Sequence, residues 1–300
     1  MGGRQGTSRI GLGGATFGRE IDESAVHLVL DYAVRRGITF FDTALAYGDG
    51  VSESILGNWV ASRRPSPTSV TLATKIAPPY QPARIAEVVD GCLRRLRVPA
   101  IDVLYLHWWD ETAESPAALA ALHALVRTGK VRRLGASNYN HLELATALRL
   151  QAEHGFEPFR VAQNNNNLAV TDLTPELRRL CAAQAIALVT YSPLGAGFLT
   201  GKHRHGVQPN SRFTFVPGLQ SIYFNQAAEQ RLDRLARIAE RHQQSQTDLA
   251  LAWALHQPDV EAVLIGARTT AHIDQALRVQ ALEATCLLRE VDQYVLEEGD

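Results

Sequence analysis

The sequence predicts an α/β fold: a single closed (β/α)8 barrel of the TIM type, in which eight parallel strands alternate with helices. Short apolar runs alternate with amphipathic helical patterns, and one strand–helix unit recurs about every 30 residues. No linker, low-complexity tract or charge run divides the chain. We therefore expect one domain over residues 1–300, with an extended loop after the seventh strand.

The strand candidates are short and apolar, as expected for parallel strands that are covered on both faces. They lie at residues 9–13, 38–42, 70–75, 101–107, 133–137, 160–164, 187–191 and 261–265. The stretch from Ser192 to Phe224, after the seventh run, carries no periodic pattern. A loop of that length inside a compact domain is typical of a functional segment.

The helix candidates have recognisable ends. Ser24 to Arg36 has one apolar face and stops at Gly37, Arg84 to Leu96 repeats apolar residues at helical spacing, and Pro116 opens a helix that reaches Thr128 before Gly129. Further helices are expected to begin at polar capping residues. These predicted N-caps are Asn140, Thr174 and Thr270.

Composition narrows the function classes. The formal net charge is −1, which does not favour a nucleic-acid or an anionic membrane surface as partner. Hydrophobic residues make up 46% of the chain, so a large core is possible, and no apolar run is long enough to cross a bilayer. Met1 to Ser8 lack the apolar stretch of a secretory signal. The cysteines Cys92, Cys181 and Cys286 fit no zinc or disulfide pattern, and we expect three buried helical thiols, no metal and a cytoplasmic protein.

Polar side chains gather where the predicted strands end. In a barrel of this type, chemistry takes place at the carboxyl ends of the strands. Lysine occurs only at positions 75, 130 and 202, so a lysine at a strand end does not reflect abundance. Candidate residues at or just after successive strand ends are Asp42, Tyr47, Lys75, His107, Ser137, Asn138, Gln163, Asn164, Tyr191, Ser192 and Arg268.

Four of these residues make an acid–base group when they meet at one mouth of the barrel. A phenol has a pKa of about 10, and a neighbouring ammonium lowers that pKa by stabilising the phenolate. We expect Lys75, held by Asp42, to act on Tyr47 in this way, and His107 to hydrogen-bond a carbonyl oxygen. Tyr47 then donates a proton while a cofactor delivers a hydride. Taken singly, Asp42 could be a helix cap, Tyr47 loop packing and His107 a core histidine.

The chain resembles the aldo-keto reductases along nearly its whole length. The matching segments occur in one order, which makes the resemblance specific. They are Gly37-Ile-Thr-Phe-Phe-Asp-Thr-Ala44 with Tyr47-Gly48, Ser52-Glu-Ser-Ile-Leu-Gly57, Thr74-Lys75, Asp102-Val-Leu-Tyr-Leu-His107, Gly129-Lys-Val-Arg132, Leu134-Gly-Ala-Ser-Asn138, Tyr191-Ser-Pro-Leu194, Gly197, Leu199-Thr-Gly-Lys202 and Gly266-Ala-Arg268.

The resemblance implies an NADPH-dependent oxidoreductase that reduces a small-molecule aldehyde or ketone. It places the catalytic tetrad at Asp42, Tyr47, Lys75 and His107, the nicotinamide carboxamide contacts at Ser137, Asn138 and Gln163, and the stacking aromatic at Tyr191. The remaining cofactor positions are Ser192, Leu194, Gly197, Lys202, Arg212, Gly266, Arg268, His272 and Gln275. Because guanidinium groups suit phosphate oxygens, we expect Arg268 and Arg212 to contact the 2′-phosphate that distinguishes NADPH from NADH.

Two parts of the pattern depart from the family. Asn164 to Asn167 replace the usual aromatic residue after Gln163, and His272, Gln275 and Ala276 stand where the family has Gln, Glu and Asn around the adenine. Other hydride-transfer folds fit poorly. Gly11 to Thr16 begins like a dinucleotide loop but lacks its last glycine, so we expect a tight turn at the barrel bottom instead. No Tyr-x-x-x-Lys and no His-Glu-x-x-His occurs.

The sequence indicates the substrate less clearly than it indicates the reaction. Trp108, Trp109 and Asn165 are candidate contacts, and adjacent aromatic and amide groups suit a keto-sugar or another hydroxylated natural-product intermediate. Alternatively, the loop residues there, with His203 and His205, are simply solvated. Two further functions stay open: a redox-sensing, partner-binding homologue such as the potassium-channel β subunits, and a dehydrogenase working in the oxidative direction. The sequence does not indicate an oligomeric state.

Overall fold

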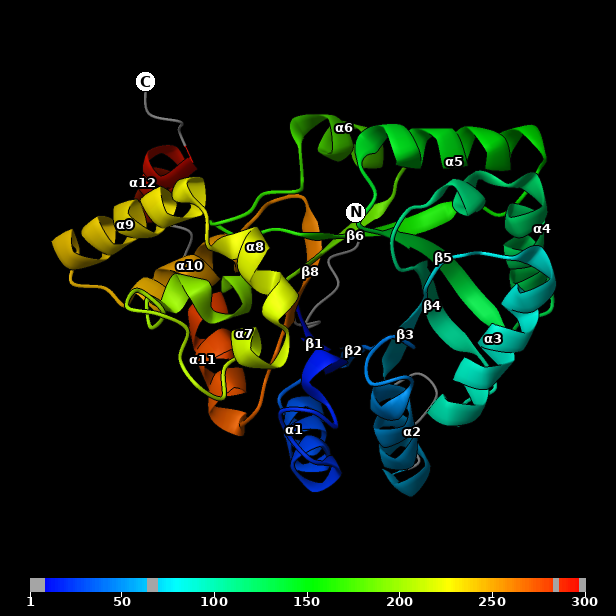
Figure 1. Ribbon diagram of the computed structural model, residues 1–300, viewed down its shortest axis with the longest axis horizontal. Coiled ribbons are helices and arrows are strands. Elements are labelled where there is room, and N and C mark those ends of the chain that lie inside the picture. The colour runs from blue at the N-terminus through cyan, green and yellow to red at the C-terminus, as the bar shows by residue number, and fades with distance from the viewer. Residues whose placement is uncertain (1–8, 64–69, 283–285, 297–300) are drawn as a thin grey trace.

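The computed structural model describes residues 9–63, 70–282 and 286–296, so the predicted absence of a leader in residues 1–8 lies outside the described part. Eight strands form one closed barrel in chain order, β1 to β8, and every neighbouring pair is parallel. Helices surround the barrel (Figure 1). The predicted (β/α)8 fold is confirmed.

The strands lie where the apolar runs predicted them, and no bound differs by more than two residues. Neighbouring strands and helices cover both faces, which is why near-continuous apolar runs marked them correctly. The strands are β1 (Ile10–Gly13), β2 (Phe40–Asp42), β3 (Thr71–Ile76), β4 (Ile101–Leu106), β5 (Val131–Ser137), β6 (Phe159–Asn165), β7 (Ala187–Tyr191) and β8 (Val260–Ile265).

The helices of the first six units are α1 (Glu23–Arg35), α2 (Val51–Arg63), α3 (Pro82–Leu96), α4 (Pro116–Arg127), α5 (His141–Glu153) and α6 (Pro175–Ala183). Two predicted N-caps are confirmed, since Asn140 accepts from the backbone N–H of Leu142 and Glu143 and Thr174 accepts from that of Leu177. The third was wrong by one residue: Thr269 is the N-cap of α11 (Thr270–Gln280), and Thr270 is already helical.

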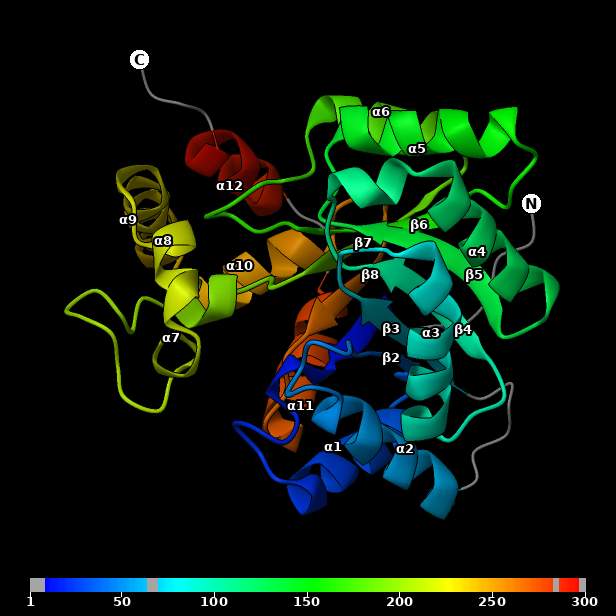
Figure 2. The same ribbon diagram turned by 45° about the vertical axis from the view of Figure 1, so that its right-hand side comes forward.

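The connection from β7 to β8 is long, as predicted, but the stretch from Ser192 to Phe224, which has no periodic pattern, contains short helices, and two longer helices follow it. The connection folds into η3 (Gly195–Thr200), α7 (Arg212–Phe215), η4 (Pro217–Leu219), α8 (Gln220–Tyr223), α9 (Gln226–Arg241) and α10 (Gln246–Leu255). With α11 and α12 (Cys286–Leu296) these elements gather on one side of the barrel (Figures 1 and 2). Aromatic rings of Phe198, Phe213, Tyr223 and Phe224 pack around buried His203 and give this connection a core of its own.

The segment from Gly11 to Thr16 was assigned wrongly to a turn at the barrel bottom. Gly11 to Gly13 belong to β1, and Gly14 to Thr16 form the short helix η1 at the carboxyl end of that strand. Gly11 is required in the strand because a Cβ there would lie 2.7 Å from Leu264 and 2.8 Å from Phe40. The glycines therefore serve close packing inside the barrel, which explains why they resemble a dinucleotide loop without being one.

Two expectations from composition can be compared with the structure. Cys92 in α3 and Cys181 in α6 are buried free thiols, as predicted, whereas the side chain of Cys286 at the start of α12 lies outside the described set. In the portion of the chain that the structure describes, no helix is both long and apolar enough to cross a membrane.

Candidate active site

A cavity of about 470 Å³ opens at the carboxyl ends of the strands. All four residues predicted to form the acid–base group line it: Asp42, Tyr47, Lys75 and His107. The wall also contains every position predicted to contact a cofactor, namely Ser137, Asn138, Gln163, Tyr191, Ser192, Leu194, Gly197, Lys202, Arg212, Gly266, Arg268, His272 and Gln275. One hollow thus joins residues that are up to about 230 positions apart, because the closed barrel brings all strand ends together.

A buried ion pair forms the floor of this cavity. Lys75 on β3 donates to Oδ1 of Asp42 at the end of β2 and, over 3.0 Å, to the backbone oxygen of Thr43. The second carboxylate oxygen of Asp42 accepts from Nε2 of Gln163 on β6 at 2.9 Å. Lys75 and Asp42 are 1% and 2% exposed. Burial raises the pKa of Asp42, although Lys75 and Gln163 act in the opposite direction.

Tyr47 lies in the connection between β2 and α2, with its ring against the ammonium. The Nζ atom of Lys75 is 5.3 Å from the centre of that ring. Burial raises the pKa of Tyr47 and Lys75 counteracts it, so the net pKa is above its ordinary value. The expected direction of the lysine's influence is present, but the expectation of a net lowered pKa was wrong because desolvation outweighs the ammonium.

His107 follows β4 and is held as a neutral imidazole. Burial, and then the charge of Lys75, lower its pKa to about 3. Its ring packs edge-on against Tyr47 at a centroid distance of 5.8 Å, and the centre of the exposed Trp108 ring lies 4.7 Å from that of His107. A neutral imidazole donates one hydrogen bond without adding charge. His107 can therefore orient a carbonyl oxygen next to Tyr47.

Asn138 links three strand ends across the mouth. Its Nδ2 donates to the backbone oxygen of His107 at 2.9 Å, and its Oδ1 accepts from the hydroxyl of Tyr191 at 2.6 Å. The residue adopts φ = 60°, in the left-handed region, and Ser192 after β7 does so with φ = 56°. Such backbone is costly for residues with a side chain and tends to occur at functional sites.

Three basic side chains that have no carboxylate partner among the described residues lie close to one another in the cavity wall. Lys202, Arg268 and His272 share this wall, and none of them forms an ion pair with an acidic residue that the structure describes. Burial lowers the pKa of Lys202 and of His272, and in both the charge of Arg268 lowers it further. Basic groups that repel one another without a counter-charge make a site for an anion.

Arg212 differs from these three groups. Its Nη1 binds the carboxylate of Glu20 and the backbone oxygen of Ala15, both at 2.9 Å, and thereby ties α7 to the segment after β1. The side chain of Glu20 is 2% exposed. Arg212 thus already has a carboxylate partner in Glu20, which it shares with Arg19, and Arg212 is not a free phosphate ligand in this structure.

The predicted substrate contacts fall outside the described cavity wall. Asn165 is bonded to the hydroxyl of Tyr223 and to Asn167, and Trp109 donates to Glu114 in η2 (Glu111–Glu114). Of the loop residues for which solvation was the alternative, Asn164 to Asn167 and His203 are buried, whereas His205 is exposed. Trp108 alone combines exposure with contact to His107.

Some cavity residues were missed by the sequence reading. They include Thr16 and Glu20 after β1 and Thr247 and Leu251 of α10. The rule that strand ends carry the site could have identified the first two, since both lie in the segment between β1 and α1. Nothing in the pattern of α10 could have identified the others, because their position depends on how the β7–β8 connection folds back. In the described ranges, no three His, Cys, Asp or Glu side chains cluster as a metal site.

The fold and the mouth of the barrel define a class: a (β/α)8 barrel with a buried Asp–Lys pair beside a tyrosine and a neutral histidine. The sequence model of the aldo/keto reductase family matches residues 9–285, and the chain belongs to that family. Members of this family are oxidoreductases that act on small-molecule carbonyl compounds and generally use NADH or NADPH.

Named relatives agree with this membership. The chain is 28% identical to Protein tas of Escherichia coli, over 87% of this chain and 86% of the relative. It is 30% identical to human Aflatoxin B1 aldehyde reductase member 4, with coverages of 89% and 86%. It is 31% identical to Probable aldo-keto reductase 1 of Glycine max, with coverages of 95% and 83%.

Proposed function

We propose that this protein reduces an aldehyde or a ketone to an alcohol with NADPH, and that Tyr47 is the general acid. The observation that carries the proposal is the placement of Lys75, which is buried, bound to Asp42 and set against the ring of Tyr47. An ammonium held in this position stabilises the phenolate that remains after proton transfer. A structural ion pair alone does not need a tyrosine and a histidine beside it at a cavity wall.

The cavity supports a dinucleotide as the cofactor. The uncompensated basic end, with Lys202, Arg268 and His272, suits phosphate groups, and the first turn of α11 adds backbone N–H groups that favour anions. Gly266 has no atom within 4 Å of the place where a Cβ would stand, so the wall is open there. Ser137, Asn138, Gln163 and Tyr191 would hold the nicotinamide end near the acid–base group.

The protein's own groups then have separate roles. When bound, NADPH supplies the hydride. Tyr47 gives its hydroxyl proton to the carbonyl oxygen, so that the two-electron reduction is balanced by one proton. Lys75 stabilises the negative charge that is left on Tyr47, Asp42 holds Lys75, and neutral His107 donates a hydrogen bond that orients the carbonyl. The alcohol product leaves, and Tyr47 regains its proton from solvent.

For the substrate, we propose a small carbonyl compound that contacts Trp108. This exposed ring beside His107 offers an apolar surface next to the reacting oxygen. A keto-sugar or other hydroxylated intermediate, as expected from the amide run, loses the support of Asn165, whose side chain is bonded inside the protein. Trp108 favours a carbonyl group attached to an apolar or ring-shaped body.

The test is a turnover screen of the purified protein with simple aldehydes, aromatic ketones and ketoses, each with NADPH and with NADH, read as cofactor absorbance. We expect steady, multiple turnovers with NADPH and at least one carbonyl class. The same assay in reverse, with the product alcohol and NADP⁺, compares the two directions. Tight cofactor binding with no more than one turnover for any substrate would instead favour the redox-sensing, partner-binding function.

A further inference from the structure

The inner layer of the barrel directly beneath the acid–base group contains a tyrosine that the proposed chemistry does not use. Tyr105 on β4 is fully buried and belongs to the small core that fills the barrel interior with Val103, Val161 and Leu264. In the sheet register it is the direct neighbour of Lys75 on β3. It does not belong to the cavity wall, so it touches neither the proposed cofactor site nor the carbonyl site.

The ring of Tyr105 faces the Lys75 ammonium. The Nζ atom lies 5.7 Å from the centre of this ring, within the range of a cation–π contact, and 5.3 Å from the centre of the Tyr47 ring. Two hydrogen bonds of the ammonium go to Asp42 and Thr43. In a site that excludes water, electron-rich ring faces replace part of the hydration that a buried cation loses.

A glycine keeps this ring in place. Gly135 on β5 is the register neighbour of Tyr105, and a Cβ at position 135 would lie 2.5 Å and 2.7 Å from two carbons of the ring. Any larger residue there would push the ring out of its place. Lys75, Tyr105 and Gly135 therefore form one row across three adjacent strands, in which the smallest residue makes room for the largest.

The ring of Tyr105, and not its hydroxyl group, faces the Lys75 ammonium. The hydroxyl is buried and makes no hydrogen bond of normal geometry with a described residue, and the polar side chain that acts on it is that of Gln163. Loss of an unpartnered hydroxyl costs little, whereas loss of the ring removes the surface that faces the cation. The geometry thus separates the two parts of the side chain, and a phenylalanine at this position should keep the relevant one.

We propose that Tyr105 is a positioning residue whose ring face stabilises the charged form of Lys75, with Gly135 holding the ring in register. This role rests on the proposed function insofar as charged Lys75 assists Tyr47. The ring makes no contact with substrate or cofactor. It acts only through the lysine, and its effect is to keep the buried ammonium protonated and close to Tyr47.

The chain offers a direct measurement, because lysine occurs only at positions 75, 130 and 202. Labelling with ¹³C-lysine gives three Cε signals, and the variant Lys75→Met assigns the one from Lys75. A pH titration of that signal reports the protonation of the lysine without any catalytic assay. We expect the variant Tyr105→Leu to lower the apparent pKa of Lys75 by about 0.5 to 1.5 units, and Tyr105→Phe to leave it unchanged.

The matched control is Tyr139→Leu. Tyr139 is also buried, also has an unpartnered hydroxyl and lies outside the cavity wall. Its replacement should cost similar stability and leave the Lys75 titration as in the wild type. Equal titrations in Tyr105→Leu and Tyr139→Leu would overturn the proposal, and so would equal shifts in Tyr105→Phe and Tyr105→Leu, which would assign the effect to the hydroxyl.

A series of fluorinated phenylalanines at position 105 and a turnover measurement complete the test. If Tyr105→Leu does not fold, phenylalanines with one to three ring fluorines at position 105 weaken the ring face stepwise at nearly constant shape, and the pKa of Lys75 should fall with each fluorine. A flat series overturns the proposal. Turnover measured on the same variants should fall about threefold to tenfold for Tyr105→Leu. An unaltered turnover with a shifted Lys75 signal would contradict the proposed function and leave the ring–lysine contact intact.

Discussion

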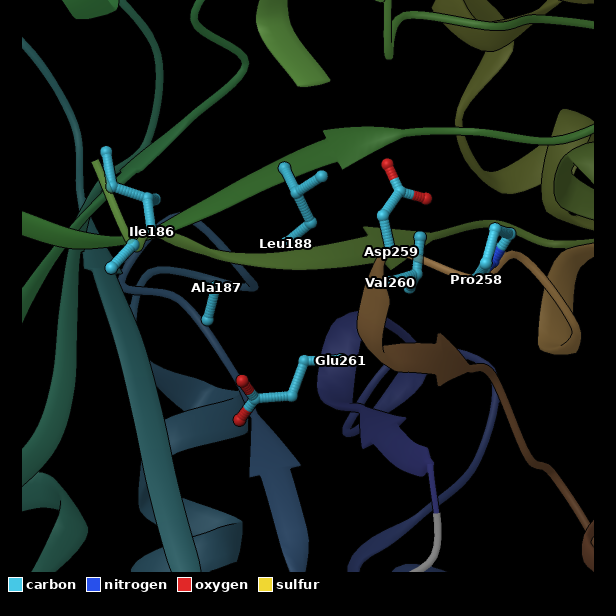
Figure 3. A pocket seen from close by; sticks show the side chains of 8 residues that line it. Ile186, Ala187, Leu188, Pro258, Asp259, Val260 and Glu261 are labelled. Carbon is cyan, nitrogen blue, oxygen red and sulfur yellow. The ribbon is translucent and has the colours of Figure 1, made fainter. Parts of the chain in front are cut away.

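Each end of the barrel has a cavity, and the two cavities differ in whether their charged side chains are buried or exposed. At the carboxyl end, about 470 Å³ are lined by the Asp42–Lys75 pair, Tyr47, His107 and an unbalanced basic group. At the amino end, about 350 Å³ lie between the starts of β7 and β8, lined by residues 185–188 and 258–261 (Figure 3). There Asp259 and Glu261 are exposed, and Asp259 is paired with Arg178.

The difference shows that a hollow of sufficient size is not enough to make a site. At the amino end, water and a partner balance the charges, so their interactions are weak and have no direction. At the carboxyl end the Asp42–Lys75 pair is buried, and burial together with neighbouring charges alters the pKa values of Asp42, Tyr47 and His107. Groups shifted in this way can exchange protons with a substrate, which is why reactivity is expected at one end alone.

The largest difference in turnover between a variant at the carboxyl end and one at the amino end is expected for Tyr47→Phe. This change keeps the ring against Lys75 but removes the transferable proton, and general acid catalysis contributes roughly 10²–10⁴-fold. We expect turnover to fall by at least that range while the dissociation constant for NADPH stays near normal. The control is Asp259→Asn at the amino end, which should turn over like the wild type. A Tyr47→Phe protein within a few-fold of the wild type would remove Tyr47 from the mechanism.

Lys75→Met tests whether the buried charge is needed. Without the ammonium the pKa of Tyr47 should rise further, because burial is then no longer opposed, and the alkaline limb of the pH–rate profile should move up by about 1 unit or more. Turnover should fall on the order of tenfold to a hundredfold. Asp42→Asn should act in the same direction but more mildly. If the pH–rate profiles of both variants overlay that of the wild type, Lys75 is structural.

Arg268→Ala concerns the basic end of the same cavity. A charged hydrogen bond contributes about 1.5–3 kcal/mol, and about 1.4 kcal/mol corresponds to tenfold in affinity. The dissociation constant for NADPH should therefore rise by roughly one to two decades while that for NADH hardly changes, as measured by fluorescence titration. Arg178→Ala at the amino end should affect neither. Equal losses for both cofactors would place Arg268 at the pyrophosphate or at the backbone oxygen of Asn210, which it already contacts.

The smallest effect concerns stability and follows from His107. Its folded pKa of about 3 lies below the ordinary 6.5, so between these values the unfolded chain binds a proton that the folded chain does not. Stability is therefore lost as the pH falls below 6.5, by up to about 2 kcal/mol at pH 5. Urea unfolding at pH 5 and pH 7.5 should show this loss in the wild type, with a smaller loss in His107→Gln. Equal losses in both proteins would mean that His107 titrates normally.

From the sequence, the strands and the positions of the four residues predicted to form the acid–base group could be placed, because both follow from local pattern and one rule of barrel geometry. Apolar runs marked the strands, and parallel strands in a closed barrel end at the same mouth. The ordered segments resembling one family made the same four positions specific. Those parts need no knowledge of how distant side chains pair, and they agree with the structure.

The sequence could not show which side chains from distant segments pair with one another, or which of two opposing effects on a pKa is larger. The pairing of Arg212 with Glu20 depends on where the β7–β8 connection returns across the mouth. The run of asparagines looks solvated, but the amide of Asn167 accepts from the backbone N–H of Ala169 and Val170 and donates to the oxygen of Ser192, so it can be buried. The net pKa of Tyr47 depends on the opposing effects of burial and of the Lys75 charge, and both are set by the folded structure.

The glutamate at position 53 helps to fix the distance between Tyr47, the proposed proton donor, and the Lys75 ammonium. Fully buried Glu53 in α2 accepts from the hydroxyl of Thr74, the residue before Lys75, at 2.6 Å and from Arg95 of α3 at 2.7 Å. The segment that carries Tyr47 is therefore anchored to the strand that carries Lys75 at a point outside the reactive mouth. Residues of the turn between Tyr47 and α2 can therefore be replaced, in evolution or by design, while these two hydrogen bonds of Glu53 keep the distance between Tyr47 and Lys75.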